Sequence, residues 1–408
     1  MNYKMVGFVL GRIFLIEAAL MLFPMGCAAI YGEWASIPAF LIPVVILLVL
    51  GLAASLKSPK DTKIYARDGL AIVALVWVLL SVFGALPFII TGEIPSFVDA
   101  FFEMVSGFTT TGSTILTDVE SLSHGILFWR SFSHWIGGMG VLVFAMAVLP
   151  MTDGRAMHLM RAEVPGPTCG KISSKLSDSA KILYAIYLTM TVIETVMLCA
   201  GGMPLFDALI HSFGTALRTA FFQVSSIVTT TGYATVDFNL WPTYSRVVIV
   251  ILTFVGACAG STAGGLKVSR VIIFFKAARQ DLNKMLHSHA VTTVRFEGKP
   301  LDEKTLRGVH NYFNIYIMLL TLSVLLVSLD GFDVVTTFTA VATCLNNVGP
   351  GLELVCPMGS FAEFSAPVKL LLAFDMLAGR LELYPMLALF APRLWRKRIN
   401  AMHEARAK

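Results

Sequence analysis

The sequence predicts an all-α polytopic membrane protein in which a span, a short re-entrant helix, a polar loop and a second span form a repeated unit. Three observations support this class: the composition, the spacing of the apolar segments and the recurrence of one polar motif. Of the 408 residues, 56% are hydrophobic and only 14% are charged, and the mean hydropathy is +0.75. Such a composition lies far outside the range of soluble globular domains.

Apolar stretches long enough to cross a bilayer, about 20 residues each, predict about eight spans. We expect the first to be a retained span and not a signal peptide, because Glu17 interrupts its apolar run and no convincing small-residue cleavage site follows. Basic residues gather in alternate connections, so the positive-inside rule places both termini in the cytoplasm of a multi-pass inner-membrane protein. The spans begin near Met5, Ile37, Gly69, Gly125, Ser179, Tyr244, Val309 and Ser365.

Three shorter apolar segments lie between the spans, and each ends in a polar loop. At about ten to fourteen residues they are too short to cross, so we expect each to enter and leave on the outer face. DAFFEMVSGFTTTGS (99–113) shares eight of its fifteen positions with TAFFQVSSIVTTTGY (219–233). An alignment without gaps places NNVG of TTFTAVATCLNNVGP (336–350) opposite the TTTG of the first copy. Internal repetition of this kind indicates symmetry about a central axis.

The repeated loop predicts a cation filter. A polar loop at membrane depth must line a polar cavity or lie buried in protein, because lipid cannot satisfy its backbone. Rings of main-chain carbonyls can replace the hydration oxygens of a cation, and glycine permits the positive φ that turns successive carbonyls one way. The short helix before each loop directs its partly negative C-terminal end at the same cavity. We therefore predict span–pore helix–filter loop–span units around a central pore.

The filter residues follow from this alignment. Threonine hydroxyls and asparagine amides could add oxygens or brace the loop from behind. A single copy could also be a helix-ending turn with a C-cap glycine, but three aligned copies favour the filter. It is predicted at Thr109, Thr110, Thr111, Gly112, Thr229, Thr230, Thr231, Gly232, Asn346, Asn347, Val348 and Gly349, with Thr110, Thr111, Thr230, Thr231, Asn346 and Asn347 as cation ligands.

A second polar insertion, GACAGSTAGGLKVSR (256–270), interrupts the span that begins near Tyr244. Close helix packing is one explanation for its glycines. We favour a flexible intramembrane gate beneath the filter, because this span is too long for one crossing. A charged side chain such as Arg380 in the last span is costly inside a membrane and usually faces a cavity or a partner. Arg380 could therefore act as a gate latch or as a structural anchor to loop carbonyls. The gate is predicted at Gly256, Gly260, Ser261, Thr262, Gly264, Gly265, Lys267 and Arg380. GGMG (137–140) we expect to serve packing.

Together these motifs resemble the membrane subunit of the Trk/Ktr superfamily of potassium transporters. The resemblance rests on DAFFEMVSGFTTTG, GACAGSTAGGLKVSR, LNNVGPGL and GRLEL and covers nearly the whole chain. It implies potassium uptake with K⁺ as the bound and transported ion, a glycine-rich gate in the third repeat, and an arginine that matches Arg380. It also implies contact with membrane lipid, a homodimer and a cytoplasmic nucleotide-binding regulatory subunit of the RCK type. No nucleic-acid partner is expected. The basic segment 276–299 could bind that subunit or anionic lipid headgroups.

The chain departs from this family pattern in its second repeat. FDALIHSFGTA (206–216) is similar to the start of a pore helix, but the filter positions that follow hold Leu217, Arg218, Thr219 and Ala220, without a glycine. We expect that the second filter and two neighbouring spans are missing, which leaves three filter quadrants where the family needs four. The predicted domains are two N-terminal spans (1–65), a first pore repeat (66–155), a composite of the second and third repeats (156–275), and a cytoplasmic linker with the last repeat (276–408).

Two functions follow from these predictions. The first is potassium uptake across the cytoplasmic membrane through a carbonyl-lined filter with a Gly-rich intramembrane gate. The alternative is a non-conducting remnant of the same family that still dimerises or binds the regulatory subunit. We expect no enzyme and no organic cofactor, because the sequence lacks G-x-S-x-G and H-E-x-x-H motifs and its six cysteines form no C-x-x-C pair.

Overall fold

The computed structural model describes most of the chain outside one long central stretch. The described residues are 2–56, 59, 66–118, 121–139, 226–227, 230, 232, 234, 237–256, 264–286, 293–296, 299–381 and 383–392. Their α-helices are α1 (Tyr3–Leu20), α2 (Leu22–Ile30), α3 (Ile37–Ser55), α4 (Ala66–Thr91), α5 (Phe97–Phe108), α6 (His124–Met139), α12 (Thr243–Phe254), α13 (Val268–Leu286), α14 (Glu303–Val327), α15 (Val334–Leu345), α16 (Ala366–Arg380) and α17 (Tyr384–Leu389). Short 3₁₀ turns η1 (Trp34–Ser36), η2 (Phe238–Leu240), η3 (Ser328–Asp330) and η4 (Glu353–Val355) join them.

The strands in the described residues are two-residue pairs. They are β1 (Val255–Gly256) with β2 (Leu266–Lys267), which run parallel, and β3 (Arg295–Phe296) with β4 (Lys299–Pro300), which run antiparallel. The helical architecture predicted from the sequence is therefore confirmed.

Four helical segments of the described chain are long and apolar enough to cross a membrane. They are Tyr3–Ile30, Trp34–Ser55, Asp68–Thr91 and Glu303–Asp330, and they coincide with the predicted spans that begin near Met5, Ile37, Gly69 and Val309. Two other predicted spans are not continuous helices. In the span predicted near Tyr244, the helix breaks after α12. In the span predicted near Ser365, α16 ends at Arg380, and a second helix, α17, begins after Leu383, whose φ is +63°. The span predicted near Ser179 lies outside the described residues.

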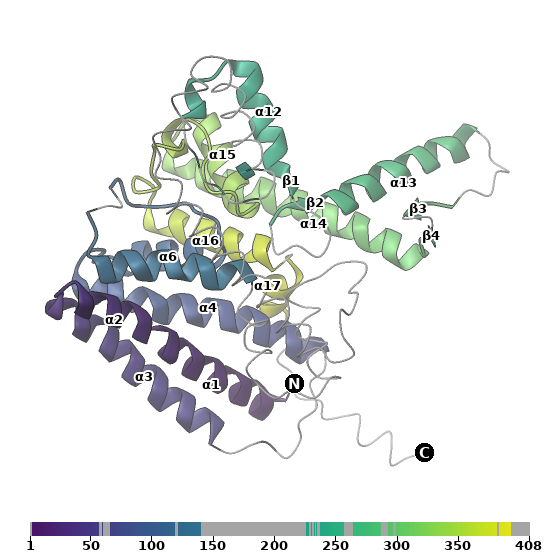
Figure 1. Ribbon diagram of the computed structural model, residues 1–408. Helices are drawn as coiled ribbons and strands as arrows, with labels where there is room; N and C mark the ends of the chain where they lie inside the picture. Colours follow the sequence, from purple (N-terminus) through teal and green to yellow (C-terminus); the bar gives the residue numbers. More distant parts are fainter. Residues whose placement is uncertain are drawn as a thin grey trace, which may run out of the picture.

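Figure 1 shows how these helices are arranged. Helices α1, α2, α3, α4 and α6 lie alongside one another, and α1 packs mainly on α3. Helices α12, α15 and α16 lie beyond them, while α13 and α14 project as a long helical pair with β3 and β4 at the tip. At one end of the first group, Glu33 accepts hydrogen bonds from the backbone amides of His124 and Gly125 and is 2.8 Å from the His124 ring, so α2 is tied to the start of α6.

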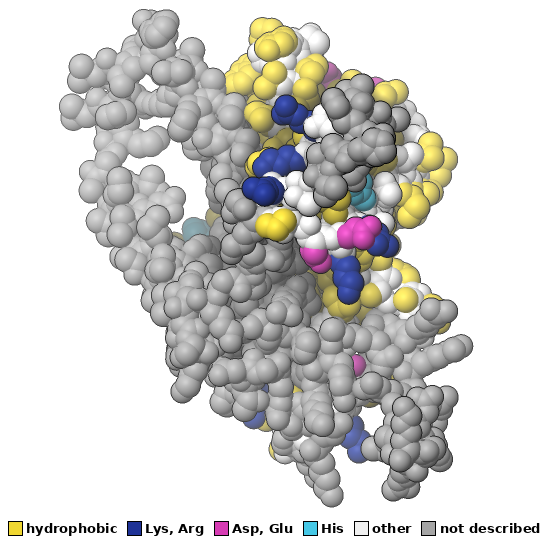
Figure 2. Space-filling model, turned by 90° about the vertical axis from the view of Figure 1, so that its right-hand side faces the viewer, with side chains coloured by type: hydrophobic (Ala, Val, Ile, Leu, Met, Phe, Trp, Pro, Cys, Tyr) yellow, Lys and Arg dark blue, Asp and Glu magenta, His cyan; other side chains and the backbone are white. Residues whose placement is uncertain are grey.

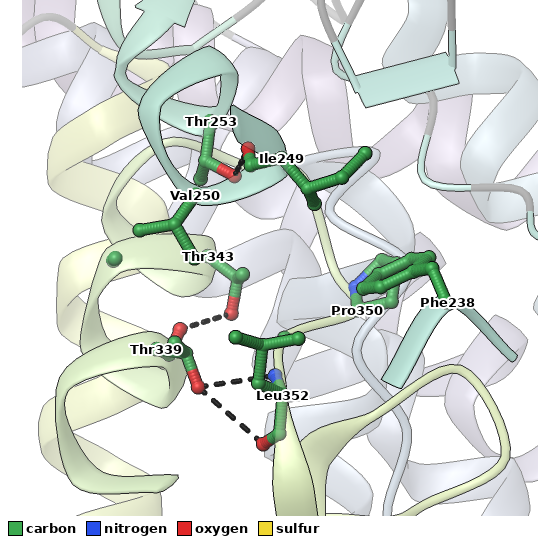
Figure 3. A pocket seen from close by; sticks show the side chains of 10 residues that line it. Phe238, Ile249, Val250, Thr253, Thr339, Thr343, Pro350 and Leu352 are labelled. Carbon is green, nitrogen blue, oxygen red and sulfur yellow. Dashed lines mark hydrogen bonds between the residues drawn. The ribbon is translucent and has the colours of Figure 1, made fainter. Parts of the chain in front are cut away.

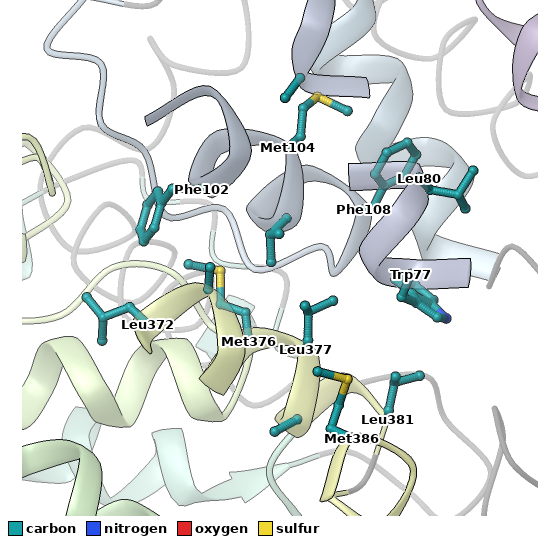
Figure 4. Packing of buried hydrophobic residues seen from close by; sticks show 14 of the residues in the cluster. Trp77, Leu80, Phe102, Met104, Phe108, Leu372, Met376, Leu377, Leu381 and Met386 are labelled. Carbon is teal, nitrogen blue, oxygen red and sulfur yellow. The ribbon is translucent and has the colours of Figure 1, made fainter. Parts of the chain in front are cut away.

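The short helix α5 sits inside the protein. It packs against α4, α6 and α16, and the apolar side chains between these helices form the contact shown in Figure 4. Phe102, Met104 and Phe108 of α5 are buried there against Trp77 of α4 and Met376 of α16. A helix of 12 residues is about 18 Å long, too short for a bilayer, so its end falls within the protein.

The units α4–α5–α6 and α14–α15–α16 repeat one local design. Both short helices have 12 residues and begin at a side-chain cap, Ser96 in one and Asp333 in the other. In the first unit Glu93 accepts from the hydroxyl of the serine that precedes α6, and in the second Asp330 accepts from the hydroxyl of Ser365 before α16. The same acid-to-serine contact therefore fixes the loop beside each short helix.

Candidate functional site

The loops after α5 and α15 share one backbone conformation with the described part of the third copy. We call them the first (109–112), third (229–232) and fourth (346–349) filter loops. The second position of each loop has a φ of +58°, +55° and +55° in Thr110, Thr230 and Asn347 respectively. The fourth position has a φ of +83°, +77° and +98° in Gly112, Gly232 and Gly349. Residues other than glycine seldom adopt positive φ, so the shared pattern shows that the loops are structural copies.

The left-handed second position forms the cap of each short helix. In the first loop the Thr110 N–H donates to Gly107 O at 3.0 Å and the Thr111 N–H donates to Ser106 O at 2.9 Å, which are the two bonds of a Schellman motif. Asn347 and Val348 repeat these bonds in the fourth loop, at 3.2 and 2.9 Å. The cap is thus made by a threonine or an asparagine, and the positive φ of the glycine two positions later is additional to it. A helix-ending glycine does not account for the loop.

The three loops meet with main chain against main chain. A Cβ atom added to Gly232 would lie 3.2 Å from Thr111 O and would overlap Val348 O. A Cβ added to Gly349 would overlap Thr111 O and lie 3.1 Å from the carbonyl carbon of Gly112. Gly112 itself has no atom within 4 Å of such a Cβ. Carbonyls from separate loops therefore converge where no side chain fits, and Gly112 borders open space.

Side chains of the first filter loop point back into the protein. Thr109 and Thr111 are fully buried, and their hydroxyl oxygens are 2.7 Å apart. Thr109 donates to Val105 O of α5 at 2.7 Å, and Ser106 donates to Ser113 O at 2.6 Å. Of the two roles that the sequence left open for such hydroxyls, these contacts are of the bracing kind.

Two asparagines tie the fourth filter loop to its surroundings. The Asn347 amide donates to Thr111 Oγ1 at 2.8 Å and to Met376 O at 2.9 Å, so one side chain joins the fourth loop to the first loop and to α16. The Asn346 side-chain oxygen accepts a bond of 2.7 Å from the hydroxyl of Tyr316 on α14. Both asparagines are fully buried, so the loop is held by α14 and α16 together.

The first and fourth filter loops are each contacted by a glycine of the helix that follows them. A Cβ on Gly137 of α6 would overlap the carbonyl of Phe108, the last residue of α5, and a Cβ on Gly379 of α16 would overlap the carbonyl of Leu345, the last residue of α15. Both glycines also face the side chain at the second loop position. The packing role predicted for GGMG is confirmed at Gly137.

A buried ion pair braces the chain after the first filter loop. Arg130 of α6 donates to Glu103 of α5 at 2.7 Å, and the same carboxylate accepts from the Thr114 hydroxyl and the Ile115 amide at 3.0 Å each. Glu103 is 1% exposed. This pair was not among the residues predicted from the sequence. A signal was present in the sequence: an acidic residue in a short apolar segment and a basic residue in the next span.

A small pocket lies beside the fourth filter loop, between α12, α15 and residues 350–352 (Figure 3). Its threonine hydroxyls are engaged: Thr253 donates to Ile249 O at 3.0 Å, and Thr343 donates to Thr339 O at 2.8 Å. Thr339 also accepts from the Leu352 amide at 3.1 Å. The pocket therefore holds the chain that leaves the filter in place and offers no free hydroxyl to an ion.

The helix is interrupted where the sequence placed the glycine-rich segment. Helix α12 ends at Phe254, Val255 pairs with Leu266, and α13 begins at Val268. Residues 257–263 lie outside the described chain, so the predictions for Gly260, Ser261 and Thr262 stay predictions, as do those for Thr229 and Thr231 of the third loop. Two adjoining candidates are placed: Gly256 pairs with Lys267, and Lys267 is buried.

The end of this glycine-rich segment touches the fourth filter loop. A Cβ on Gly264 would meet the carbonyl oxygen of Asn346 at 2.5 Å and would overlap the side-chain oxygen of Asn347. A Cβ on Gly265, whose φ is +77°, would lie 2.9 Å from the Asn346 side-chain oxygen. The predicted gate and the predicted filter are therefore in direct contact at these residues.

Arg380 lies at the junction of the first and fourth units. Its guanidinium donates to Gly137 O of α6 and lies 5.4 Å from the ring centroid of Trp77 on α4. The side chain is buried, and the residue ends α16. The bond to a main-chain carbonyl is of the anchoring kind. Asp375, five residues earlier on the same helix, accepts a hydrogen bond from Ser323 at 2.9 Å.

Helical spans joined by short helices that end in matching, converging loops define a polytopic membrane protein of the pore-loop type. The sequence profile of the TrkH family, described as a cation transport protein, matches residues 36–217 and 210–397. The chain belongs to this family.

Individual relatives agree with this assignment. The chain is 32% identical to the Trk system potassium uptake protein TrkH of Escherichia coli (strain K12) over 487 residues, which cover 97% of this chain and 100% of the relative. It is 30% identical to TrkI of Halomonas elongata over 80% of this chain and 83% of that protein. The crystal structure of the potassium transporter TrkH from Vibrio parahaemolyticus superposes with a TM-score of 0.80 at 27% identity, covering 97% of this chain and 100% of that one.

The comparisons also bear on the second repeat. The alignment with the Escherichia coli protein spans 487 positions although this chain has 408 residues, so part of the relative has no counterpart here. The family profile matches in two pieces that meet at residues 210–217. This is the place where the sequence predicts that the second filter is missing.

Proposed function

We propose that this chain is the membrane subunit of a potassium uptake system, and that K⁺ passes along main-chain carbonyls of the first, third and fourth filter loops. The observation that carries the proposal is the positive φ at the second and fourth positions of all three loops, whose main chains meet. A left-handed threonine or asparagine costs roughly 1–3 kcal/mol and persists at sites where function requires it. The names of the relatives support potassium as the cargo.

The coordinating atoms in this proposal are main-chain oxygens. The side chains of Thr111, Asn346 and Asn347 are buried and form hydrogen bonds within the protein, Asn347 through its amide nitrogen. The Asn347 side-chain oxygen has no hydrogen-bond partner among the described residues, but it packs against Gly264 and Gly379. These side chains hold the loops, and the carbonyls remain for the ion. The cation ligands predicted from the sequence would therefore act through their carbonyl groups, in the manner of a ring that replaces hydration oxygens.

We extend the proposal to a gate formed by residues 256–265 with Lys267 and Arg380. Its support is the break between α12 and α13 and the contact of Gly264 and Gly265 with the fourth filter loop. A segment without regular helix is tolerated at this depth because it is buried against protein. The bond from Arg380 to Gly137 O would hold the first and fourth units together around this segment.

Partners and topology belong to the same proposal. We place both termini in the cytoplasm, keep the four domains predicted from the sequence, and expect a homodimer with an RCK-type regulatory subunit in the lipid bilayer. Figure 2 faces the side on which α13 and α14 project, and basic side chains gather there. The exposed members among the described residues are Lys276, Arg279, Arg295, Lys304 and Arg307. Such a cationic surface would attract an acidic protein or anionic headgroups.

The alternative, a non-conducting remnant, is favoured by one specific observation. The family profile breaks at residues 210–217, and the relatives are longer than this chain. A filter with three recognisable quadrants would need another element to close its fourth side. Binding of the regulatory subunit or dimerisation would survive this loss, because neither depends on the filter.

The deciding experiment is ⁸⁶Rb⁺ uptake by a potassium-auxotrophic bacterial strain that expresses the chain. Gly112→Ser places a side chain at a φ of +83° in open space within the filter, and the matched control Gly331→Ser does so at a φ of +80° in open space outside it. Both variants carry a similar backbone strain of about 1–2 kcal/mol. The proposal expects wild-type uptake that Gly112→Ser abolishes and Gly331→Ser retains. Absence of uptake from a well-expressed, inserted wild-type chain supports the remnant.

A further inference from the structure

Asp375 is a fully buried carboxyl group in α16 that neither the filter nor the gate uses. It is 0% exposed, and its Oδ1 accepts a hydrogen bond of 2.9 Å from the Ser323 hydroxyl on α14. Its Oδ2 is also buried and has no hydrogen-bond partner among the residues that the structure describes. One hydrogen bond from a neutral hydroxyl is little compensation for a charge that has been removed from water.

The two basic residues of α16 are engaged elsewhere. Lys369 of α16 forms an ion pair of 2.5 Å with Asp99 of α5, and Arg380 donates to Gly137 O. Helix spacing agrees with this, because residues six before and five after Asp375 project from other faces of α16. In the described part of the chain, the titratable groups on other helices that face Asp375 are Tyr316 of α14 and Cys344 of α15, and neither supplies a positive charge.

We propose that Asp375 is a proton-binding site: its carboxyl group keeps a proton in the folded protein, and loss of that proton to water loosens the fourth filter loop. An isolated carboxylate in a low-dielectric interior is far more costly than a neutral acid, so the group binds a proton instead of remaining charged. An ionisable residue inside a membrane protein with no structural ion pair is by default a functional site.

The position of Asp375 connects it to the filter. The next residue, Met376, accepts through its carbonyl the bond from the Asn347 amide, and Ser323 lies on the same helix as Tyr316, which holds Asn346. The contact between Asp375 and Ser323 therefore joins the two helices, α14 and α16, that support the fourth loop. Ionisation would draw water or a cation between these helices and shift both supports at once.

The link to transport rests on the proposed function, but the proton itself can be measured without transport. Infrared spectra of the purified protein at neutral pH should show the C=O stretch of a protonated carboxylic acid, and Asp375→Asn should remove part of that band. Asn is the neutral isostere of the protonated form, so the variant should fold. Glu17→Gln is the matched control, because Glu17 is a second buried carboxyl whose oxygens lack partners, placed in α1 away from the filter.

Stability and uptake then show whether the proton acts on the filter. The folded wild-type protein keeps a proton at Asp375 that the unfolded chain releases, so its stability should fall as the pH rises for as long as the folded protein keeps that proton. Asp375→Asn should make this slope smaller. Uptake of ⁸⁶Rb⁺ should fall at higher pH, where the folded protein loses this proton, and the fall should approach tenfold per pH unit once most carboxyls are ionised. Uptake should not change with pH in Asp375→Asn, and in Glu17→Gln it should fall with rising pH as it does in the wild-type protein.

Two results would overturn the inference. An acid band that Asp375→Asn leaves intact would mean that Asp375 is ionised, with a bound cation in place of the proton. A stability slope unchanged in Asp375→Asn would place the titrating group elsewhere. If the wild-type chain takes up no ⁸⁶Rb⁺, the proposed function fails, and the band and the stability slope still decide the proton site.

Discussion

Replacement of Glu103 by glutamine should destabilise the protein strongly, because it breaks a buried ion pair from one side. The carboxylate is 1% exposed, and the side chain of its partner Arg130 is 16% exposed. Glutamine keeps the size of the side chain but removes the charge. It also replaces one of the two carboxylate oxygens with an NH₂ group, which cannot accept a hydrogen bond from the backbone N–H of Ile115.

The magnitude follows from these contacts. Removing one partner of a buried pair costs about 3–5 kcal/mol, because the other charge is left uncompensated. The unsatisfied amide of Ile115 would contribute about 1–3 kcal/mol by itself, but the two effects share one carboxylate and are not additive. We expect a loss of about 3 kcal/mol, measured by reversible unfolding of the purified protein in mixed detergent micelles. Uptake of ⁸⁶Rb⁺ should also fall, because the chain after the first filter loop loses its brace.

The control is an ion pair of the same chemistry at the surface. Arg246 and Glu353 lie 3.1 Å apart with side chains 27% and 44% exposed, so Glu353→Gln should cost less than about 1 kcal/mol. The double variant Glu103→Gln with Arg130→Met should recover part of the loss, since no buried charge then remains. A cost below about 1 kcal/mol for Glu103→Gln would refute the reasoning, as it would show that water reaches the pair.

Three further predictions concern contacts between elements. Asp99→Asn should lower the free energy of unfolding by about 3 kcal/mol in the same assay, because it leaves the buried Lys369 unpaired. Adding Lys369→Met to this variant should restore much of the lost stability. If it restores none, the broken ion pair is not the cause of the loss. Partial burial raises the pKa of Glu33, but hydrogen bonds from the start of α6 lower it more, to below the ordinary value. The ionised Glu33 stabilises the fold above about pH 4.3, and this stabilisation is lost as the pH falls through the lowered folded-state pKa. The free energy of unfolding should therefore decrease less between about pH 5 and 3 in Glu33→Gln than in the wild-type protein. Gly137→Ala should abolish ⁸⁶Rb⁺ uptake because its methyl group meets the main chain of α5, whereas Gly7→Ala, which faces open space, should not.

The sequence predicted the class of fold and the filter loops because both are recorded locally. Composition and apolar length indicated spans, and an alignment without gaps found positions whose backbone repeats in the structure, such as Thr110 and Asn347. A glycine-rich stretch marked the break after α12. These signals depend on residues close together in the chain, where turn chemistry and hydrophobic length determine the conformation.

The contacts that hold the loops together could not be predicted in this way. Glu103 meets Arg130 and Asn347 meets Thr111 across the fold, and no spacing rule connects such partners. Asp375 and Arg380 lie on one helix, but Asp375 pairs with Ser323 of α14, which is more than fifty residues away in the sequence. Tyr316 carried no signal at all, since a tyrosine in an apolar helix is ordinary until its hydroxyl is seen to reach a filter residue.

Glycine at positions 137 and 379 has a mechanical consequence. Because these glycines have no side chain, the main chain of α6 lies directly against the end of α5, and the main chain of α16 lies directly against the end of α15. Close-packed atoms of this kind have low compressibility and transmit strain. A displacement of either helix should therefore move the adjoining carbonyls. In the proposed filter, the width of the opening would then follow the positions of α6 and α16.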